Sequence, residues 1–191
     1  RAPDELVEIY TSEDDGYADS TSSYLDFQEI RGLDGVFADV VGTRTFLARV
    51  ERGDRPEMAF GELVSWDYFQ ALGVPMALGR SFLPEEDATP GTHPVTVLGY
   101  RTWMNDFGGD PDIVGSTVRL GGTPMSVTAS SPHPSAPGDC TCPHLGSANV
   151  TVADIGSAAG SRAPVSQFRP LGQSTATIGK VGHGSGASSS S

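Results

Sequence analysis

Few residues of this sequence combine the types and spacing that catalysis requires. Ser81 stands in the run GRSFL, but a nucleophile elbow needs a second glycine two positions after the serine, and the nucleophile needs a base beside it. His93 precedes a proline in HPVTVLG, which favours the start of a strand over a catalytic base. The run HGSGAS near the end of the sequence lacks a surrounding strand, turn and helix. The sequence therefore predicts no catalytic residue and no enzyme.

Potential metal ligands are present, but their spacing is unsuitable. Cys140 and Cys142 are separated by a single residue, and His133 lies upstream. Structural zinc sites space the first two ligands further apart and add a second pair at a distance. The two thiols also cannot form a disulfide framework. The cysteine content therefore does not indicate whether the protein is in an oxidising or a reducing compartment. We expect neither a metal ion nor a cofactor.

The short acidic and recognition motifs are explained by local structure. The run EDDGYAD lacks the alternating oxygen ligands and the closing glutamate of an EF-hand, although it supplies Asp14, Asp15 and Asp19. PEEDATPG is typical of a helix that begins at Pro84 with acidic residues in its first turn. The Arg52-Gly53-Asp54 tripeptide is best explained as a hairpin turn.

A change of composition near residue 128 divides the chain. All Tyr and Trp residues and seven of the eight Phe residues lie at or before Phe107, and 22 of the 24 acidic residues precede Thr128. Between 129 and 191, 37 of 63 residues are Ser, Gly, Ala or Pro. This leaves too few large apolar side chains to offset the entropy that the segment would lose on ordering. We therefore expect one domain over residues 1–128 and a disordered tail over residues 129–191.

The first part has the pattern of an α+β domain with a sheet of antiparallel or mixed strands and short packed helices. The runs ELVEIYTS, VFADVVG, RTFLARVE, EMAFGELVS and HPVTVLG predict strands, and STVRLGGTPMSVTA predicts a hairpin that turns at Gly121-Gly122. A first helix is capped by Ser23, and a second is capped by Ser65 and ends at Gly73 before Pro75. Helical spacing predicts a structural core that contains Tyr24, Phe27, Ile30, Trp66, Phe69, Leu72, Trp103 and Phe107, with Gly73 as the turn residue.

Charge and hydropathy argue against two further classes of protein: those that bind nucleic acid, and those that carry a membrane anchor or an export signal. The net charge is −12 and no segment is rich in Lys and Arg, which argues against binding to nucleic acid. The sequence also contains neither a long apolar run nor the pattern of a signal peptide.

Several motifs occur in an order that resembles a known family. They are SSYLDFQEIRGLDGVFADVVG, GELVSWDYFQALGVPMALGRSFLPEED and HPVTVLGYRTWMNDFGGDPDIVGSTVRLGGTPMSVT. This series is similar to the MacB-like periplasmic core domain of ABC transporter permeases, which include FtsX-like permeases, and the resemblance covers residues 6–128. It implies an extracytoplasmic, non-catalytic α+β domain at the periplasmic face of the inner membrane.

The resemblance also implies partners. In the parent permease these are transmembrane helices, a cytoplasmic ATPase subunit or domain, a second permease copy, and a periplasmic adaptor or cargo protein. This chain departs from the family after the hairpin, where SSPHPSAPGDCTCPH follows. We interpret the departure as truncation with a frameshift after about residue 128, which would leave a fragment unable to transport alone. A genuine Ser/Gly-rich linker is the competing explanation. The alternative function is a free-standing soluble binding module on the same scaffold.

Overall fold

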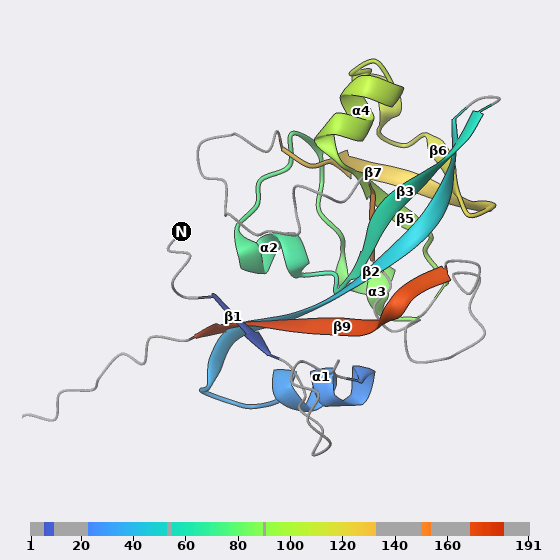
Figure 1. Ribbon diagram of the computed structural model, residues 1–191. Helices are drawn as coiled ribbons and strands as arrows, with labels where there is room; N and C mark the ends of the chain where they lie inside the picture. The colour runs from blue at the N-terminus through green and yellow to red at the C-terminus, as the bar shows by residue number, and fades with distance from the viewer. Residues whose placement is uncertain are drawn as a thin grey trace, which may run out of the picture.

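Nine strands form one mixed sheet in the part of the chain that the computed structural model describes (Figure 1). The described residues are 6–9, 23–52, 55–89, 91–132, 150–153 and 169–181. The strands are β1 (Leu6–Ile9), β2 (Phe37–Arg52), β3 (Arg55–Val64), β4 (Leu78–Gly79), β5 (Val95–Leu98), β6 (Thr117–Leu120), β7 (Thr123–Ser130), β8 (Val150–Ala153) and β9 (Arg169–Val181). The helices are α1 (Tyr24–Arg31), α2 (Tyr68–Leu72), α3 (Pro84–Asp87) and α4 (Tyr100–Asp106), with a 3₁₀ helix, η2, over Pro111–Ile113. The predicted α+β class with short packed helices is confirmed.

Six of the strands close into a ring. Strand β2 pairs with β3, β3 with β8, β8 with β5, β5 with β7, β7 with β6, and β6 returns to β2. The β3–β8 and β5–β7 pairs are parallel and the others are antiparallel. We call these six strands the ring; its closure pairs strand edges that an open sheet would leave exposed.

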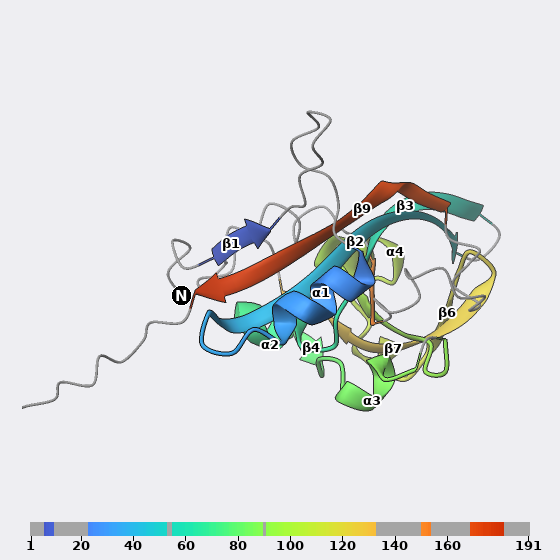
Figure 2. The same ribbon diagram turned by 90° about the horizontal axis from the view of Figure 1, so that it is seen from below.

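Strand β2 is shared between the ring and a second unit. It is 16 residues long, and the part from Thr43 to Arg52 pairs with β3 along one edge. On the other edge, residues 37–47 pair with β9, whereas Val50 and Glu51 pair with β6. Strand β1 then pairs with the far edge of β9, and α1 contacts β2. We call β1, β9 and α1 the extension; Figures 1 and 2 show β1 beside β9, with α1 alongside β2.

Two clusters of buried apolar side chains stabilise the ring. The first contains Phe46, Leu120 and Met125 from its strands, together with Phe27 of α1. The second lies beneath α2 and contains Tyr68, Phe69 and Phe82 with side chains from β5. All four residues of β5 are buried, as expected for a strand that has cover on both faces.

Several predicted element boundaries differ from the structure. The runs VFADVVG and RTFLARVE form one strand, because Gly42 pairs with Thr177 of β9 and continues the ladder. The N-cap of α2 is Asp67, not Ser65. Ser65 is buried, and its hydroxyl instead accepts a hydrogen bond from the Gly42 N–H at 3.2 Å.

The predicted tail contains ordered strands. Residues 150–153 form β8 and residues 169–181 form β9, and both strands pair within the sheet. The run VTVA in β8 has β-branched residues that suit a buried strand, although the surrounding composition predicted disorder. The division of the chain near residue 128 stays a prediction for the segments outside the described residues.

Candidate functional site

The residues with catalytic potential do not form a catalytic arrangement in the described part of the chain. The Ser81 hydroxyl is buried there without a hydrogen-bond partner. His93 is exposed, and its Nδ1 lies 3.0 Å from the Thr92 hydroxyl. No group of three or more His, Cys, Asp or Glu among the described residues could hold a metal ion. The cysteine pair, His133 and the Asp14–Asp19 loop lie outside the described residues.

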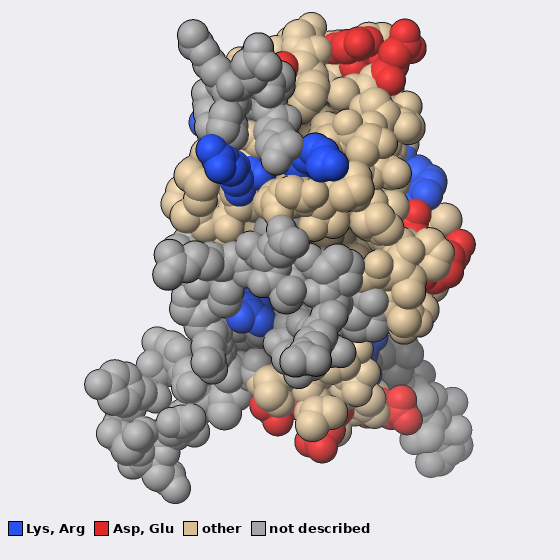
Figure 3. Space-filling view, turned by 90° about the vertical axis from the view of Figure 1, so that its right-hand side faces the viewer, with Lys and Arg blue, Asp and Glu red and all other residues tan. Residues whose placement is uncertain are grey.

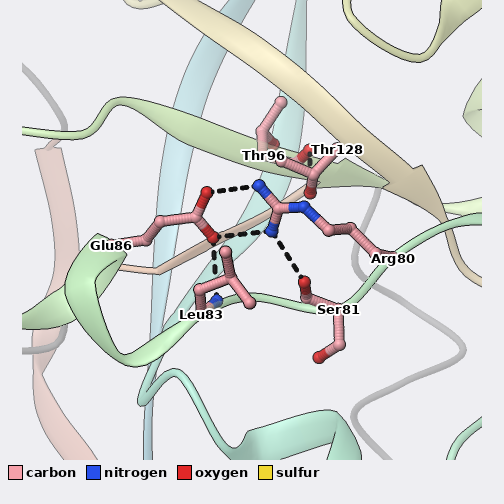
Figure 4. Close-up of polar contacts among 6 residues, drawn as sticks. All are labelled: Arg80, Ser81, Leu83, Glu86, Thr96 and Thr128. Atoms are coloured by element: carbon pink, nitrogen blue, oxygen red, sulfur yellow. Dashed lines mark hydrogen bonds and ion pairs between the residues drawn. The ribbon is translucent and has the colours of Figure 1, made fainter.

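Next to Ser81, Arg80 and Glu86 form an ion pair that fixes the loop before α3 (Figure 4). The Arg80 guanidinium donates to both carboxylate oxygens of Glu86, at 3.0 and 2.7 Å, and to the carbonyl of Ser81 at 3.0 Å. Glu86 also accepts from the Leu83 N–H at 2.8 Å. Burial opposes ionisation of Glu86, but these donors outweigh it and lower the pKa of the carboxyl group. Because Glu86 holds the guanidinium in a bidentate contact, we interpret Arg80 as structural.

Backbone contacts join this loop to the ring. The Arg80 N–H donates to the carbonyl of Thr128 at 3.1 Å, and Gly79 precedes it with φ of +78°. A Cβ atom at Gly79 would collide with the same Thr128 carbonyl. The position therefore requires glycine for both its conformation and its close approach to β7.

A buried carboxyl group lies between β3 and α2. Glu62 is only 4% exposed, and its Oε2 has no hydrogen-bond partner among the described residues. Burial raises the pKa of Glu62 to about 7, and a hydrogen bond with Tyr68 opposes part of this rise. Tyr68 is itself fully buried and packs edge to face on Phe69, with ring centroids 5.3 Å apart. The charge of Glu62 therefore changes near neutral pH, within the layer that holds α2 on the sheet.

The two ends of the described chain meet on the extension. Leu6, the first described residue, pairs with Lys180, and Val181, the last, pairs with Phe37 at the start of β2. Leu33 and Val36, in the connection from α1 to β2, are exposed close to this end of the sheet. Any neighbouring part of a longer protein would therefore enter and leave at one place, and we take the β1–β9–β2 end as the candidate functional site.

Comparison with protein families decides the relationship. The model of the MacB-like periplasmic core domain matches residues 2–168. The chain belongs to this family. The match extends past Thr128, where the resemblance was expected to stop, and it includes β8.

Three solved structures have a similar fold. The periplasmic region of MacB from Actinobacillus actinomycetemcomitans is 12% identical, with a TM-score of 0.65, over 93% of this chain and 75% of that one. The extracellular domain of the ABC-type transporter YknZ from Gram-positive bacteria is 14% identical, with a TM-score of 0.65, over 93% and 84%. A domain of a permease protein from Porphyromonas gingivalis is 13% identical, with a TM-score of 0.50, over 86% and 69%. No curated protein sequence matches the chain. Among the helices in the described ranges, none is both long and apolar enough to cross a membrane.

In this MacB-like domain, the predicted core residues lie at different depths. Phe27, Phe69 and Leu72 are buried. Partly buried side chains pack against the two clusters at Tyr24, Ile30, Trp66, Trp103 and Phe107. Gly73 ends α2 in the left-handed conformation, with φ of 68°.

Other buried side chains are not among the predicted core residues. Phe46, Phe82 and Met125 are among the most buried side chains. The alternation of TFLARV could have indicated Phe46, and the alternation of TPMSV could have indicated Met125. Nothing local distinguishes Glu62 from the exposed acidic residues.

Proposed function

We propose that this chain is the extracytoplasmic, non-catalytic domain of an ABC transporter permease. In this role it couples motion driven by a cytoplasmic ATPase to a cargo or partner protein outside the membrane. By itself the domain moves no cargo, because the driving reaction belongs to another part of the transporter. Its partners are the permease transmembrane helices, the ATPase, a second permease copy, and a periplasmic adaptor or cargo protein.

The pairing of Leu6 with Lys180 carries this proposal. A domain inserted between two membrane helices needs its entry and exit side by side, and antiparallel pairing of β1 with β9 provides this. Strand β9 then pairs with β2 over residues 37–47, so a displacement at the chain ends reaches a strand of the ring directly. Membership of the MacB-like family supports the same role.

The test places this domain in a working transporter. Residues 6–181 would replace the periplasmic region of the Actinobacillus MacB, and ATP hydrolysis would be measured in membranes. A disulfide between Leu6→Cys and Lys180→Cys, made in a Cys140→Ser, Cys142→Ser background, would join the two chain ends. Antiparallel partners have Cα atoms within the range that disulfides span. We expect oxidation to lower hydrolysis and reductant to restore it.

A matched control separates coupling from general stiffening. Ala48 and Ala59 are cross-strand partners inside the ring, so Ala48→Cys with Ala59→Cys adds a disulfide far from the chain ends. This second bridge should leave hydrolysis unchanged. Hydrolysis that is insensitive to the Leu6–Lys180 bridge, once that bridge is shown to have formed, would argue against coupling at this site.

The closed ring favours a second candidate, a free-standing binding module. A ring with its own apolar core could fold without membrane helices. A cooperatively melting monomer that captures a partner, together with a chimera that shows no coupled hydrolysis, would support this alternative.

A further inference from the structure

Glu62 differs from most acidic side chains of this protein because it lies inside the molecule. Figure 3 shows acidic side chains exposed at the top, at the right edge and at the bottom of one face. Glu62 is only 4% exposed. Glu86, the other buried acid among the described residues, is compensated by its bidentate contact with Arg80. A buried carboxylate without such a contact loses its hydration, so burial favours the neutral acid.

The strands beside Glu62 offer it no charge. Its cross-strand partners are Thr45 of β2 and Thr151 of β8, both neutral. Tyr68 of α2 forms a hydrogen bond with the carboxyl group, but Oε2 has no partner among the described residues. This single contact does not offset burial, which raises the pKa of Glu62 to about 7. In mildly acidic solution the folded protein therefore holds Glu62 as a neutral acid.

The charged groups that border this layer do not neutralise Glu62. They are Arg44 of β2, Arg31 of α1, Asp67 at the start of α2 and Asp87 of α3. Arg44 pairs with Leu63, the residue after Glu62, so it lies on the opposite face of the sheet. Arg31 forms an ion pair with Asp67 at 2.5 Å. Strand β8 carries no titratable side chain. An ionised Glu62 therefore has no counter-ion among these residues.

The start of α2 is bonded to several other elements. The Trp66 N–H donates to the Asp87 carboxylate of α3 at 3.1 Å, and Asp67 binds Arg31 of α1. Tyr68 follows with its hydrogen bond to the buried carboxyl group of β3. Three consecutive residues thus link α2 to two other helices and to the sheet. A displacement of α2 would therefore break contacts with α1 and α3 as well.

Helix α2 depends on these contacts because it has little stability of its own. It has five residues, no side-chain hydrogen bond at its N-cap, and a C-cap, Gly73, in the left-handed conformation. A helix of this length is not stable by itself in water and is held by its tertiary packing. It also lies outside the strand ladders of the sheet. Such elements open before a hydrogen-bonded sheet does.

We propose that protonation of Glu62 controls a local opening of α2: the neutral carboxyl group keeps α2 on the sheet, and loss of the proton opens α2 ahead of the ring. Opening lets water reach the carboxylate, which removes the cost of a buried charge without a counter-ion. It also separates Asp67 from Arg31, so the ion pair between α2 and the extension is lost. The switch stands on the fold alone and holds for either proposed function.

The direction of the switch follows from the two ionisation states. The pKa of Glu62 is higher in the closed protein, at about 7, than the ordinary value of 4.5 that it regains on opening. The closed form is therefore fully favoured below pH 4.5, and this advantage is lost as the pH rises through about 7.

The test measures amide hydrogen exchange of the full chain by NMR at pH 5 and pH 8, corrected for intrinsic rates, which gives an opening constant at each amide. The probes are the N–H groups of Ala71 and Val74, which donate to carbonyl groups within the α2 segment at 2.8 Å. The reference is the Val127 N–H of β7, which donates to Ser116 at 2.9 Å. Unfolding of the whole ring also exposes Glu62, so the comparison with Val127 identifies a local opening.

Two variants and one titration complete the test. Glu62→Gln keeps the shape of the side chain and removes its charge. Glu29→Gln, at an exposed position on α1, is the matched control. An NMR titration of the Glu62 carboxyl carbon in the unsubstituted chain gives a result that does not depend on how a variant folds.

We expect the opening constants at Ala71 and Val74 to rise about a hundredfold from pH 5 to pH 8, as the two pKa values require. At pH 8 they should exceed that of Val127 by at least about tenfold. They should stay nearly constant in Glu62→Gln and rise in Glu29→Gln as in the unsubstituted chain. Equal opening constants at Ala71 and Val127 would mean that α2 opens only with the whole ring and would overturn the proposal. A rise that persists in Glu62→Gln, or a Glu62 carboxyl group that titrates near 4.5, would overturn it as well.

Discussion

The ring and the extension meet at β2 but differ in how they are stabilised. The ring closes on itself and holds two apolar clusters, with side chains such as Phe46 and Phe69 almost fully buried. The extension has two strands and one helix, and α1 contributes one fully buried side chain, Phe27. An ion pair from Arg31 to Asp67 at 2.5 Å joins α1 to the N-cap of α2. The ring is therefore expected to be the more stable region, and the extension the less stable one.

The largest expected effect tests the ring itself. Phe69→Ala should lower the free energy of unfolding by about 3–5 kcal/mol, because it leaves a cavity beneath α2. Phe27→Ala should instead reduce hydrogen-exchange protection mainly in the extension. Leu25→Ala, at a position 68% exposed on the same helix as Phe27, should change stability by no more than about 0.5 kcal/mol. An unchanged unfolding midpoint for Phe69→Ala would contradict the role of the cluster beneath α2 in stabilising the ring.

The next effect depends on pH. The pKa of Glu62 rises from its ordinary value of 4.5 to about 7 on folding, so the folded state favours the protonated form. This stabilisation is fully present below pH 4.5 and is lost as the pH rises through about 7. Unfolding measured in urea should show about 3 kcal/mol less stability at pH 8 than at pH 4.5 from this group. Glu62→Gln should flatten that part of the profile, and an unaltered profile would rule out Glu62 as its source.

A smaller effect tests packing inside the ring. A Cβ atom at Gly61 would collide with the buried Phe46 ring. Gly61→Ala should therefore cost about 1–3 kcal/mol in thermal or chemical unfolding. The double variant Gly61→Ala, Phe46→Leu should recover part of the loss. No recovery would mean that the glycine is needed for another reason.

The smallest effect belongs to the extension. The Ser23 hydroxyl accepts from the Asp26 N–H at 3.2 Å, and the Asp26 carboxylate accepts from the Ser23 N–H at 2.8 Å. Ser23→Ala should cost about 1 kcal/mol, with the loss of hydrogen-exchange protection confined to α1. Ser23→Asp should retain most of the cap. Loss of protection throughout the ring would show that the two regions unfold together.

Local patterns predicted the elements better than their assembly. The Ser23 cap, the start of α3 at Pro84 and the turn at Gly121-Gly122 depend on neighbours in sequence, and the structure contains all three. The N-cap of α2 differed because Ser65 bonds across strands to Gly42, a contact that no sequence window contains.

Long-range pairing accounts for the rest. Ring closure requires β6 to reach β2, nearly 70 residues earlier in the chain, through only Val50 and Glu51. Strand β9 has a composition poor in large apolar residues, and its partners, β1 and β2, both lie more than 100 residues earlier in the sequence. Glu62 is buried because α2 and β8 pack beside it in the folded domain. Its raised pKa therefore follows from tertiary packing and not from its neighbours in sequence.

The β1–β9 ladder also determines how the domain would respond to mechanical load. Its four cross-strand pairs begin at Leu6 and Lys180, where both chain ends leave the sheet. Forces that draw these ends apart act on one pair at a time, so they break the pairs in order, beginning with Leu6 and Lys180. Forces that move both ends together cause no relative displacement of β1 and β9, so the two strands move as one body. The same four pairs are thus compliant to separation of the ends and stiff to their joint movement.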